Sequence, residues 1–234
     1  MKKLVEIRSL NLHPGKRGEF HRRYLEKALP LLKKWKMDVV AFGPSLHDEN
    51  SFYVIRAFDS LEHRQESEDA YYESSDWRQG PREEMVALIE SYIDIVLEME
   101  EETVNALRRN VADSPRKMKK TVEIRSYNLK PGRRAEFHRL VLEKSLPMLK
   151  RWKVDVVAFG PSPHDENSYY LIRAYKSLEE RQASQDAFYG SDEWRKGPRD
   201  EIVGLIENYT TIVIEMEEVT VNALRKKATP YSPL

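Results

Sequence analysis

The sequence predicts an α+β protein made of two tandem ferredoxin-like domains, each with the element order βαββαβ. Three observations lead to this prediction. Residues 1–9 return as residues 118–126 with a single change, and the offset of 117 then continues without a gap. Four segments of each copy alternate apolar and polar residues, which is typical of strands. Segments with helical spacing follow the first and the third of these strands.

The chain is a tandem duplication. Residues 1–110 and 118–227 share about 76 identical positions. This period is too long for a solenoid repeat, so each copy is expected to be a domain. Residues 111–117 are the predicted linker, because Pro115 and its polar neighbours fit an exposed boundary. Residues 228–234 are left as a C-terminal tail.

The first half of each copy predicts a strand, a long helix and two further strands. Residues 4–12 alternate in period two, and Pro14-Gly15 ends this strand. Residues 16–36 have helical spacing, within which Pro30 should kink or divide the helix. The apolar face of this helix consists of Phe20, Tyr24, Ala28, Leu32 and Trp35. The next two strands are expected at residues 38–44 and 51–58, joined by a polar hairpin connection.

The second half predicts a helix, a turn and the last strand. Ser60 begins a helix that ends near residues 74–75, and the second copy has a capping-box pattern at the same place, Ser177-Leu178-Glu179-Glu180. Gly80-Pro81 then precedes a helix over about 82–91. A strand over 92–100 and a short helix over 103–109 complete the copy.

A ferredoxin-like sheet has helices on one face only, so its other face needs a cover. The duplication supplies one: the two antiparallel sheets are expected to pack face to face as an intramolecular α/β barrel. In the first strand Glu6 and Arg8 share one face, and Val5 and Ile7 share the other. We expect the apolar faces to pack on the helices and the mixed faces to line the barrel. An equivalent barrel between two chains, and hence a homo-oligomer, stays open.

Charged residues within apolar strands are the candidate binding site. Burying them unpaired costs several kcal/mol, so they must pair, reach water or meet a ligand. Arg8 and Arg56, with Arg125 and Arg173 in the second copy, would bind a carboxylate, phosphate or enolate. The alternative is a salt network that joins Arg8 and Arg56 to carboxylates. The carboxylates considered for this network are Glu6 and Glu98.

Proton-transfer candidates are His21, His138 and Tyr127. The two histidines occupy equivalent places in the apolar stripe of the first helix, where a histidine could act as acid or base near neutral pH. The alternative is a partly buried helix residue bonded to a carbonyl or carboxylate. Tyr127 has no phenolic equivalent in the first copy, where Leu10 stands.

Aromatic residues gather after the second helix of each copy. Trp77 and Trp194 are candidate ligand-binding residues, because aromatic side chains beside an arginine suit a planar or acidic ligand. This region could be a mobile lid over the sheet. It could equally be a small satellite core beneath a loop.

Composition excludes several classes of protein. Lys+Arg and Asp+Glu are both 39, which argues against a nucleic-acid binder. No apolar run is long enough to span a bilayer, and no signal peptide is recognisable, so a cytoplasmic protein is expected. The chain has no cysteine, no metal-binding spacing of histidines and no nucleotide or serine-hydrolase motif. We therefore expect no metal and no cofactor.

Each copy resembles the NIPSNAP family of the dimeric α/β-barrel superfamily. In the second copy the resemblance rests on the run Glu123-x-Arg125-x-Tyr127-x-Leu129-x-Pro131-Gly132 and on later positions that keep the family's order and spacing. Those later positions are Arg173, Tyr175, Ser177, Arg181 and Trp194. The first copy departs from this pattern at Leu10 and Phe58. The resemblance covers nearly all of the chain and implies the fold, but it carries over no catalytic residues.

Three functions stay open. The first is binding of a small molecule with an apolar or aromatic body and an acidic group, in a pocket between sheet and helices. The second is a cofactor-independent monooxygenase, isomerase or lyase on the same pocket, as members of the superfamily are. The third is a structural or interaction module without catalysis. Because Leu10 and Phe58 replace Tyr127 and Tyr175, one copy could bind while the other is structural.

Overall fold

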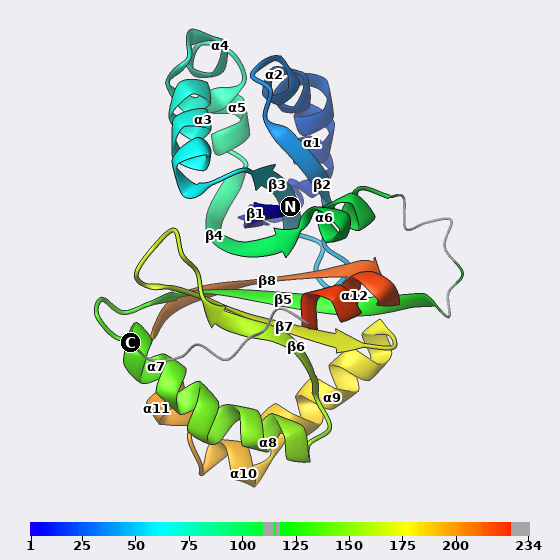
Figure 1. The fold of residues 1–234 in the computed structure, drawn as a ribbon, viewed down its shortest axis with the longest axis vertical. Coiled ribbons are helices and arrows are strands. Elements are labelled where there is room, and N and C mark those ends of the chain that lie inside the picture. Colours follow the sequence, from blue (N-terminus) through cyan, green and yellow to red (C-terminus); the bar gives the residue numbers. More distant parts are fainter. Residues whose placement is uncertain (110–114, 116–117, 226–234) are drawn as a thin grey trace. The chain divides into compact units, whose positions relative to one another are not determined.

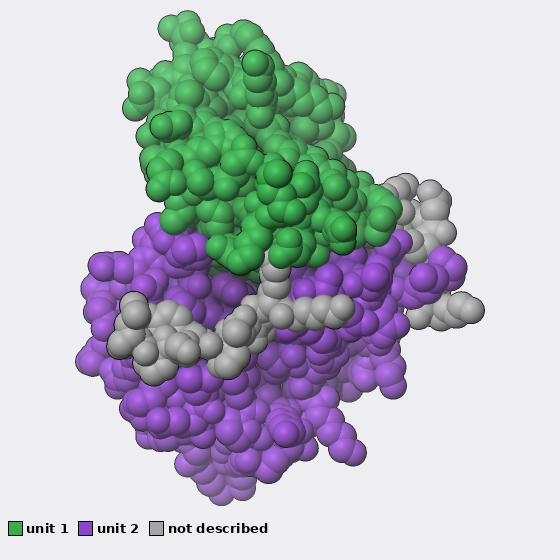
Figure 2. All heavy atoms as spheres, viewed as in Figure 1, with its two compact units in different colours: residues 1–109 green, residues 110–234 purple. Residues whose placement is uncertain are grey.

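The computed structural model describes residues 1–109, 115 and 118–225. The chain divides into two compact units, residues 1–109 and residues 110–234 (Figure 2). The predicted linker, Pro115 excepted, and the predicted tail at 228–234 lie outside the described residues.

The first unit contains one four-stranded antiparallel sheet with strand order β2-β3-β1-β4. Its elements are β1 (Lys2–Leu12), α1 (Arg17–Arg23), the π-helical turn η1 (Tyr24–Ala28), α2 (Leu29–Lys34), β2 (Asp38–Pro44), β3 (Ser51–Phe58), α3 (Leu61–Glu73), α4 (Ser75–Arg78), α5 (Arg82–Val86), β4 (Ile89–Glu100) and α6 (Glu101–Arg108). The βαββαβ order predicted from the sequence is confirmed.

The second unit repeats this arrangement with strand order β6-β7-β5-β8. Its elements are β5 (Lys119–Leu129), α7 (Arg134–Leu140), the π-helical turn η4 (Val141–Ser145), α8 (Leu146–Arg151), β6 (Asp155–Pro161), β7 (Ser168–Tyr175), α9 (Leu178–Gly190), α10 (Asp192–Arg195), α11 (Arg199–Val203), β8 (Ile206–Glu217) and α12 (Glu218–Arg225). The α+β class and the tandem repeat are therefore confirmed as well.

The long first helix is widened before its proline rather than broken there. The backbone N–H of Leu29 donates to the carbonyl of Tyr24, five residues earlier, and α2 continues through Pro30. Pro30 has no N–H to donate, so a wider π-helical turn just before it lets the helix pass without an interior α-helical hydrogen bond at that residue.

The last strand begins earlier than predicted. The sequence places a helix over 82–91, whereas α5 ends at Val86 and β4 starts at Ile89. Ile89 pairs with Leu12 across a β-bulge in β1, and the backbone N–H of His13 donates to the carbonyl of Leu88 at 3.0 Å. Long-range pairing with β1 thus outweighs the local helical spacing.

Helices α1–α5 lie on one side of the first sheet, and α7–α11 lie on one side of the second (Figure 1). The predicted orientation of the sheet faces is wrong. The mixed face of the sheet lies against the helices, since Glu6 accepts from Arg64 of α3 and Arg56 bonds Glu68 of the same helix. Helix α3 has no apolar stripe. It instead supplies the opposite charges that buried charges on the sheet require.

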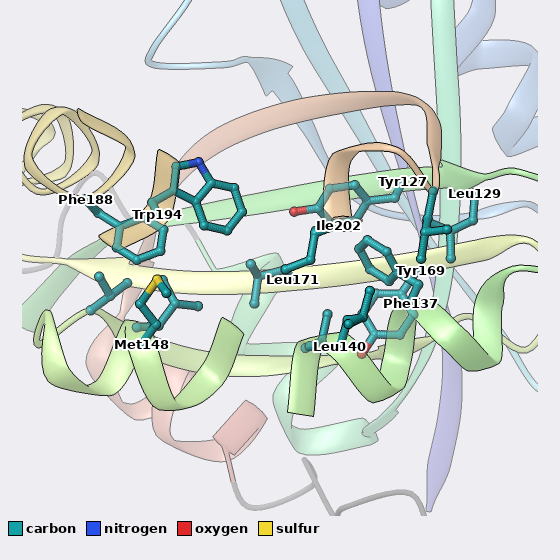
Figure 3. Close-up of a cluster of buried hydrophobic side chains, with 14 residues drawn as sticks. Tyr127, Leu129, Phe137, Leu140, Met148, Tyr169, Leu171, Phe188, Trp194 and Ile202 are labelled. Atoms are coloured by element: carbon teal, nitrogen blue, oxygen red, sulfur yellow. The ribbon is translucent and has the colours of Figure 1, made fainter. Parts of the chain in front are cut away.

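A hydrophobic core lies between the helices and the sheet of each unit. In the first unit it contains Phe20 of α1, Phe52 of β3 and Tyr71 of α3. The equivalent cluster of the second unit includes Phe137, Tyr169 and Phe188 (Figure 3).

The other face of each sheet carries the alternate residues of every strand, such as Val5, Ile7, Ile55 and Ile95 in the first unit. This face is almost entirely apolar and points away from the helices α1–α5. Face-to-face packing of the two sheets stays a prediction.

Candidate functional site

Each unit contains a cavity between its helices and its sheet. The cavity of the first unit has a volume of about 690 Å³ and is lined by the predicted ligand-binding residues Arg8, Arg56 and Trp77. Tyr24 and Tyr72 also line it. The first unit thus brings three of the sequence-predicted residues together at one place.

The cavity of the second unit is larger, with a volume of about 1110 Å³. Arg125, Tyr127 and Trp194 line it. Arg173 is not among the lining residues, but its Nη1 donates to the hydroxyl of Tyr189, which is. Figure 3 shows Tyr127 and Trp194 along the layer between sheet and helices, with the Tyr127 hydroxyl directed toward the Trp194 side.

A closed network of charges fills the base of the first cavity. Glu6 is fully buried and accepts from Arg56 Nε at 2.9 Å and from Arg64 Nε at 2.6 Å. Glu68 of α3 bonds both arginines. The Arg56 guanidinium, listed causes apart from burial being the neighbouring carboxylates, therefore keeps a pKa raised above its usual range, while Glu6 keeps a pKa well below its own against the opposing effect of burial.

Arg8 completes this network through a two-point ion pair. Its Nε and Nη2 each lie 2.7 Å from an oxygen of the Asp94 carboxylate, and its Nη1 donates to Tyr72. Among the described residues of the first network, three guanidinium groups face three carboxylates. Those residues are Arg8, Arg56, Arg64, Glu6, Glu68 and Asp94. The salt-network alternative therefore describes the first unit, with one correction: Glu98 pairs with exposed Lys2 and lies outside it.

The second unit keeps the three arginines but only one of the three carboxylates. Gln185 stands at the position of Glu68, and Thr211 at the position of Asp94. Glu123 is the one acidic group of the described network, facing Arg125, Arg173 and Arg181. The same fold thus holds a neutral cluster in one unit and an excess of two positive charges in the other.

Arg125 has an open hydrogen-bonding edge. Its Nη1 donates to the Tyr189 hydroxyl at 3.1 Å, whereas its buried Nε has no hydrogen-bond partner among the described residues. Thr211 pairs with Arg125 in the sheet, as Asp94 pairs with Arg8. The guanidinium carbon lies 5.1 Å from the ring centre of Tyr209 and 5.7 Å from that of Tyr189, so aromatic faces flank the cation.

The excess positive charge changes the acidity of its neighbours. Burial opposes ionisation of Glu123, but the three arginines outweigh it and lower the pKa of Glu123 to about 2. Burial would likewise raise the pKa of Tyr189, yet Arg125 and Arg173 outweigh it and lower the pKa below the usual tyrosine value. The cavity of the second unit therefore favours negative charge.

The predicted histidines lie elsewhere. Neither His21 nor His138 is among the described residues that line the cavities. The ring of His21 packs beside Phe52 with ring centres 5.4 Å apart, and His138 Nδ1 lies 2.8 Å from the Tyr169 hydroxyl. Burial lowers the pKa of His138. These contacts match the alternative of partly buried helix residues rather than residues that meet a ligand.

The aromatic region predicted as a lid or a satellite core is a wall of the cavity. In the first unit the rings of Tyr71 and Trp77 pack at 5.3 Å between centres, and Trp77 lines the cavity. In the second unit Trp194 packs against Phe188 at 5.4 Å. Ser191 caps the short helix α10 by accepting from the Trp194 N–H, which fixes the backbone that carries the indole.

Sequence reasoning missed the residues that helices α3 and α9 contribute. Arg64, Glu68 and Tyr72 lie one helical turn apart on one face of α3, a spacing visible in the sequence. Their importance depends on the buried charges of the sheet, which only the tertiary structure brings near them. A comparison of the copies for changes of charge would have found Gln185 and Thr211.

Two further searches of the described residues gave no result. In the ranges 1–109 and 118–225, no group of three or more acidic or histidine side chains is placed to hold a metal ion. Within the same ranges, every helix is too short or too polar to cross a membrane.

The fold and the site together define a class of protein: a tandem pair of ferredoxin-like units, each with a cavity between sheet and helices. A family model described as NIPSNAP matches residues 5–101 and 122–215. The chain therefore belongs to the NIPSNAP family. A comparison with curated proteins gave no match.

Solved structures resemble one unit or the whole chain. A NIPSNAP domain protein from Burkholderia xenovorans is 19% identical, with 48% of this chain and 98% of that chain covered and a TM-score of 0.38. A NIPSNAP family protein from Agrobacterium tumefaciens is 18% identical, with 42% and 87% covered and a TM-score of 0.40. An anthrone oxidase-like protein is 10% identical over 92% of this chain and 93% of its own, with a TM-score of 0.57, which shows a shared fold alone.

Proposed function

We propose that the second unit binds a small organic acid with an aromatic or apolar body in the cavity lined by Arg125, Tyr127 and Trp194. The observation that carries this proposal is the unequal charge of the two networks. Three buried guanidinium groups share one carboxylate in the second unit, and burial of unbalanced charge is costly unless an anion joins it.

The first unit indicates how the anion would bind. There the Asp94 carboxylate accepts from Nε and Nη2 of Arg8, the two-point geometry that arginine prefers for carboxylates. The equivalent edge of Arg125 faces Thr211, which has no negative charge, and its Nε is unbonded. A ligand carboxylate on this edge would supply the interaction that Asp94 makes in the other copy.

The remaining walls suit an aromatic body. Tyr209 stacks on the Arg125 guanidinium, Trp194 lines the same cavity, and Leu149 and Ile202 add apolar surface. In the first unit Arg8 is already paired, so we propose that the first cavity does not take an acid and that its charges hold the unit together.

The test is binding of 2-naphthoate, with 2-naphthamide as the uncharged control, followed by calorimetry. We expect binding of the acid and not of the amide. Arg125→Ala should weaken it by about 2 kcal/mol or more, since a desolvated ion pair is lost. Arg8→Ala is the matched control and should leave the affinity unchanged.

Two results would overturn the proposal. One is equal binding of acid and amide, since that would assign no role to the positive charge. The other is an equal loss of affinity in Arg8→Ala and Arg125→Ala, provided that circular dichroism shows both variants folded.

A further inference from the structure

Two phenols with different surroundings line the cavity of the second unit. Tyr189 projects from α9, and Tyr127 projects from β5 beside Arg125. The first cavity has Tyr72 in place of Tyr189 but Leu10 in place of Tyr127. The second unit therefore has a pair of cavity phenols that the first unit lacks.

The hydroxyl oxygen of Tyr189 is an acceptor for two cations. Arg125 Nη1 donates to it at 3.1 Å and Arg173 Nη1 at 3.0 Å. Both donors of these bonds are permanently charged, so the oxygen is held as a hydrogen-bond acceptor and its negative form is stabilised. This arrangement is suited to a phenolate that takes a proton.

Tyr127 has the opposite preference. It is 7% exposed, and burial raises its pKa to about 12, so that it stays a neutral O–H donor. Two titratable groups whose environments move their pKa values apart are the usual arrangement of a base and an acid in one site. Here Tyr189 has the lowered pKa and Tyr127 the raised one.

We propose that Tyr189 and Tyr127 act as base and acid in a keto–enol proton transfer on a 2-oxo acid whose carboxylate is bound by Arg125. This proposal rests on the acid-binding function proposed above and names its substrate class. A 2-oxo acid fits because it combines a carboxylate for the guanidinium with a carbonyl that makes the adjacent C–H acidic.

The step balances without an oxidant or a cofactor. The Tyr189 phenolate takes a proton from the carbon next to the carbonyl, and the C–H electron pair becomes the carbon–carbon double bond of the enol. The carbonyl oxygen accepts the proton of the Tyr127 phenol. Proton exchange with solvent then returns Tyr189 to phenolate and Tyr127 to phenol, so the net reaction is isomerisation of the keto to the enol form.

The charged and titratable groups around Tyr189 set its pH dependence. Arg125 and Arg173 face it from the sheet, and Glu123 and Tyr127 oppose its ionisation from β5. Glu123 stays ionised over the whole working range, because its pKa is about 2. The proton transfer should therefore become faster as pH rises through the ionisation of Tyr189, and slower again when Tyr127 ionises.

The experiment uses phenylpyruvate as the probe and measures exchange of its C3 protons with deuterium oxide by NMR, relative to buffer alone. We expect exchange above the buffer rate. Tyr189→Phe and Tyr127→Leu, the latter restoring the residue of the first copy, should each lower the rate by about a hundredfold or to background. Both should still bind phenylpyruvate in calorimetry. Tyr72→Phe is the matched control in the first unit and should exchange at the wild-type rate.

The outcomes separate this proposal from the binding function. Phenylpyruvate that binds through Arg125 but exchanges only at the buffer rate overturns the proton transfer and leaves acid binding intact. No binding of phenylpyruvate or 2-naphthoate overturns both. If a tyrosine variant does not fold, the pH profile of the wild-type protein decides: a rate that does not rise through an ionisation below the usual tyrosine value contradicts the role of Tyr189.

Discussion

Arg8 and Asp94 form a two-point ion pair across neighbouring strands, with both nitrogen–oxygen distances at 2.7 Å. The equivalent pair in the second unit is Arg125 and Thr211, which keeps the cation and loses the anion. One substitution in a duplicated strand thus turns a satisfied ion pair into an arginine with an open edge. The functional difference that we propose between the units follows from this change.

The buried carboxylates should differ in their effect on stability. Glu123→Gln leaves three arginines of the second network without any carboxylate, so we expect a loss of about 3–5 kcal/mol in the free energy of unfolding. Glu6→Gln leaves Glu68 and Asp94 in place and should cost less. Urea unfolding of both variants tests this order, and a larger cost for Glu6→Gln would contradict it.

Acid should remove a defined part of the stability. The pKa of Glu123 is lowered from 4.5 to about 2 in the folded chain, so its ionised form stabilises the fold above pH 4.5. This contribution, about 3 kcal/mol, should be lost as pH falls from about 4.5 to about 2. Urea unfolding across this pH range measures the slope. Glu123→Gln should reduce it, and an unchanged slope in that variant would show that other carboxylates dominate.

Backbone strain offers a route to stabilisation. Lys36 and Lys153 have φ angles of 56° and 55°, in the left-handed region after α2 and α8. Replacement of either lysine by glycine should raise the free energy of unfolding by about 0.5–1 kcal/mol. Lys33→Gly, inside α2, is the control and should destabilise the protein by about 1 kcal/mol. Destabilisation by Lys153→Gly would show that the lysine side chain outweighs the strain.

Much of the fold could be predicted from the sequence. The period-two strands, the capping serines Ser60 and Ser177, and the exact repeat led to the correct βαββαβ units. The orientation of the sheet faces was wrong, because burial of Glu6 and Arg56 against the helices depends on partners from α3. Local spacing does not reveal such partners.

The site was predicted in part. The buried arginines and the two tryptophans were found because their residue types are unusual in apolar strands or before a glycine–proline turn. Tyr189 and Gln185 were not found, since they lie on a helix without an apolar stripe. The role of Thr211 emerges only when its partner Arg125 is known.

Trp194 should report ligand binding. It is buried, lines the second cavity and packs against Tyr189 with ring centres 5.5 Å apart. Addition of 2-naphthoate is expected to change its fluorescence, because an aromatic acid in the cavity alters the surroundings of the indole. The signal should disappear in Trp194→Phe and persist in Trp77→Phe. A signal lost in Trp77→Phe instead would place the ligand in the first unit.

The number of binding sites per chain tests the central claim most directly, because each cavity can be converted to the charge state of the other. Calorimetric titration with 2-naphthoate should give one site in the wild-type protein and none in Thr211→Asp, whose new carboxylate would occupy Arg125. The double variant Asp94→Thr with Glu68→Gln should give two sites. Undiminished binding by Thr211→Asp, or two sites in the wild-type protein, would contradict the account.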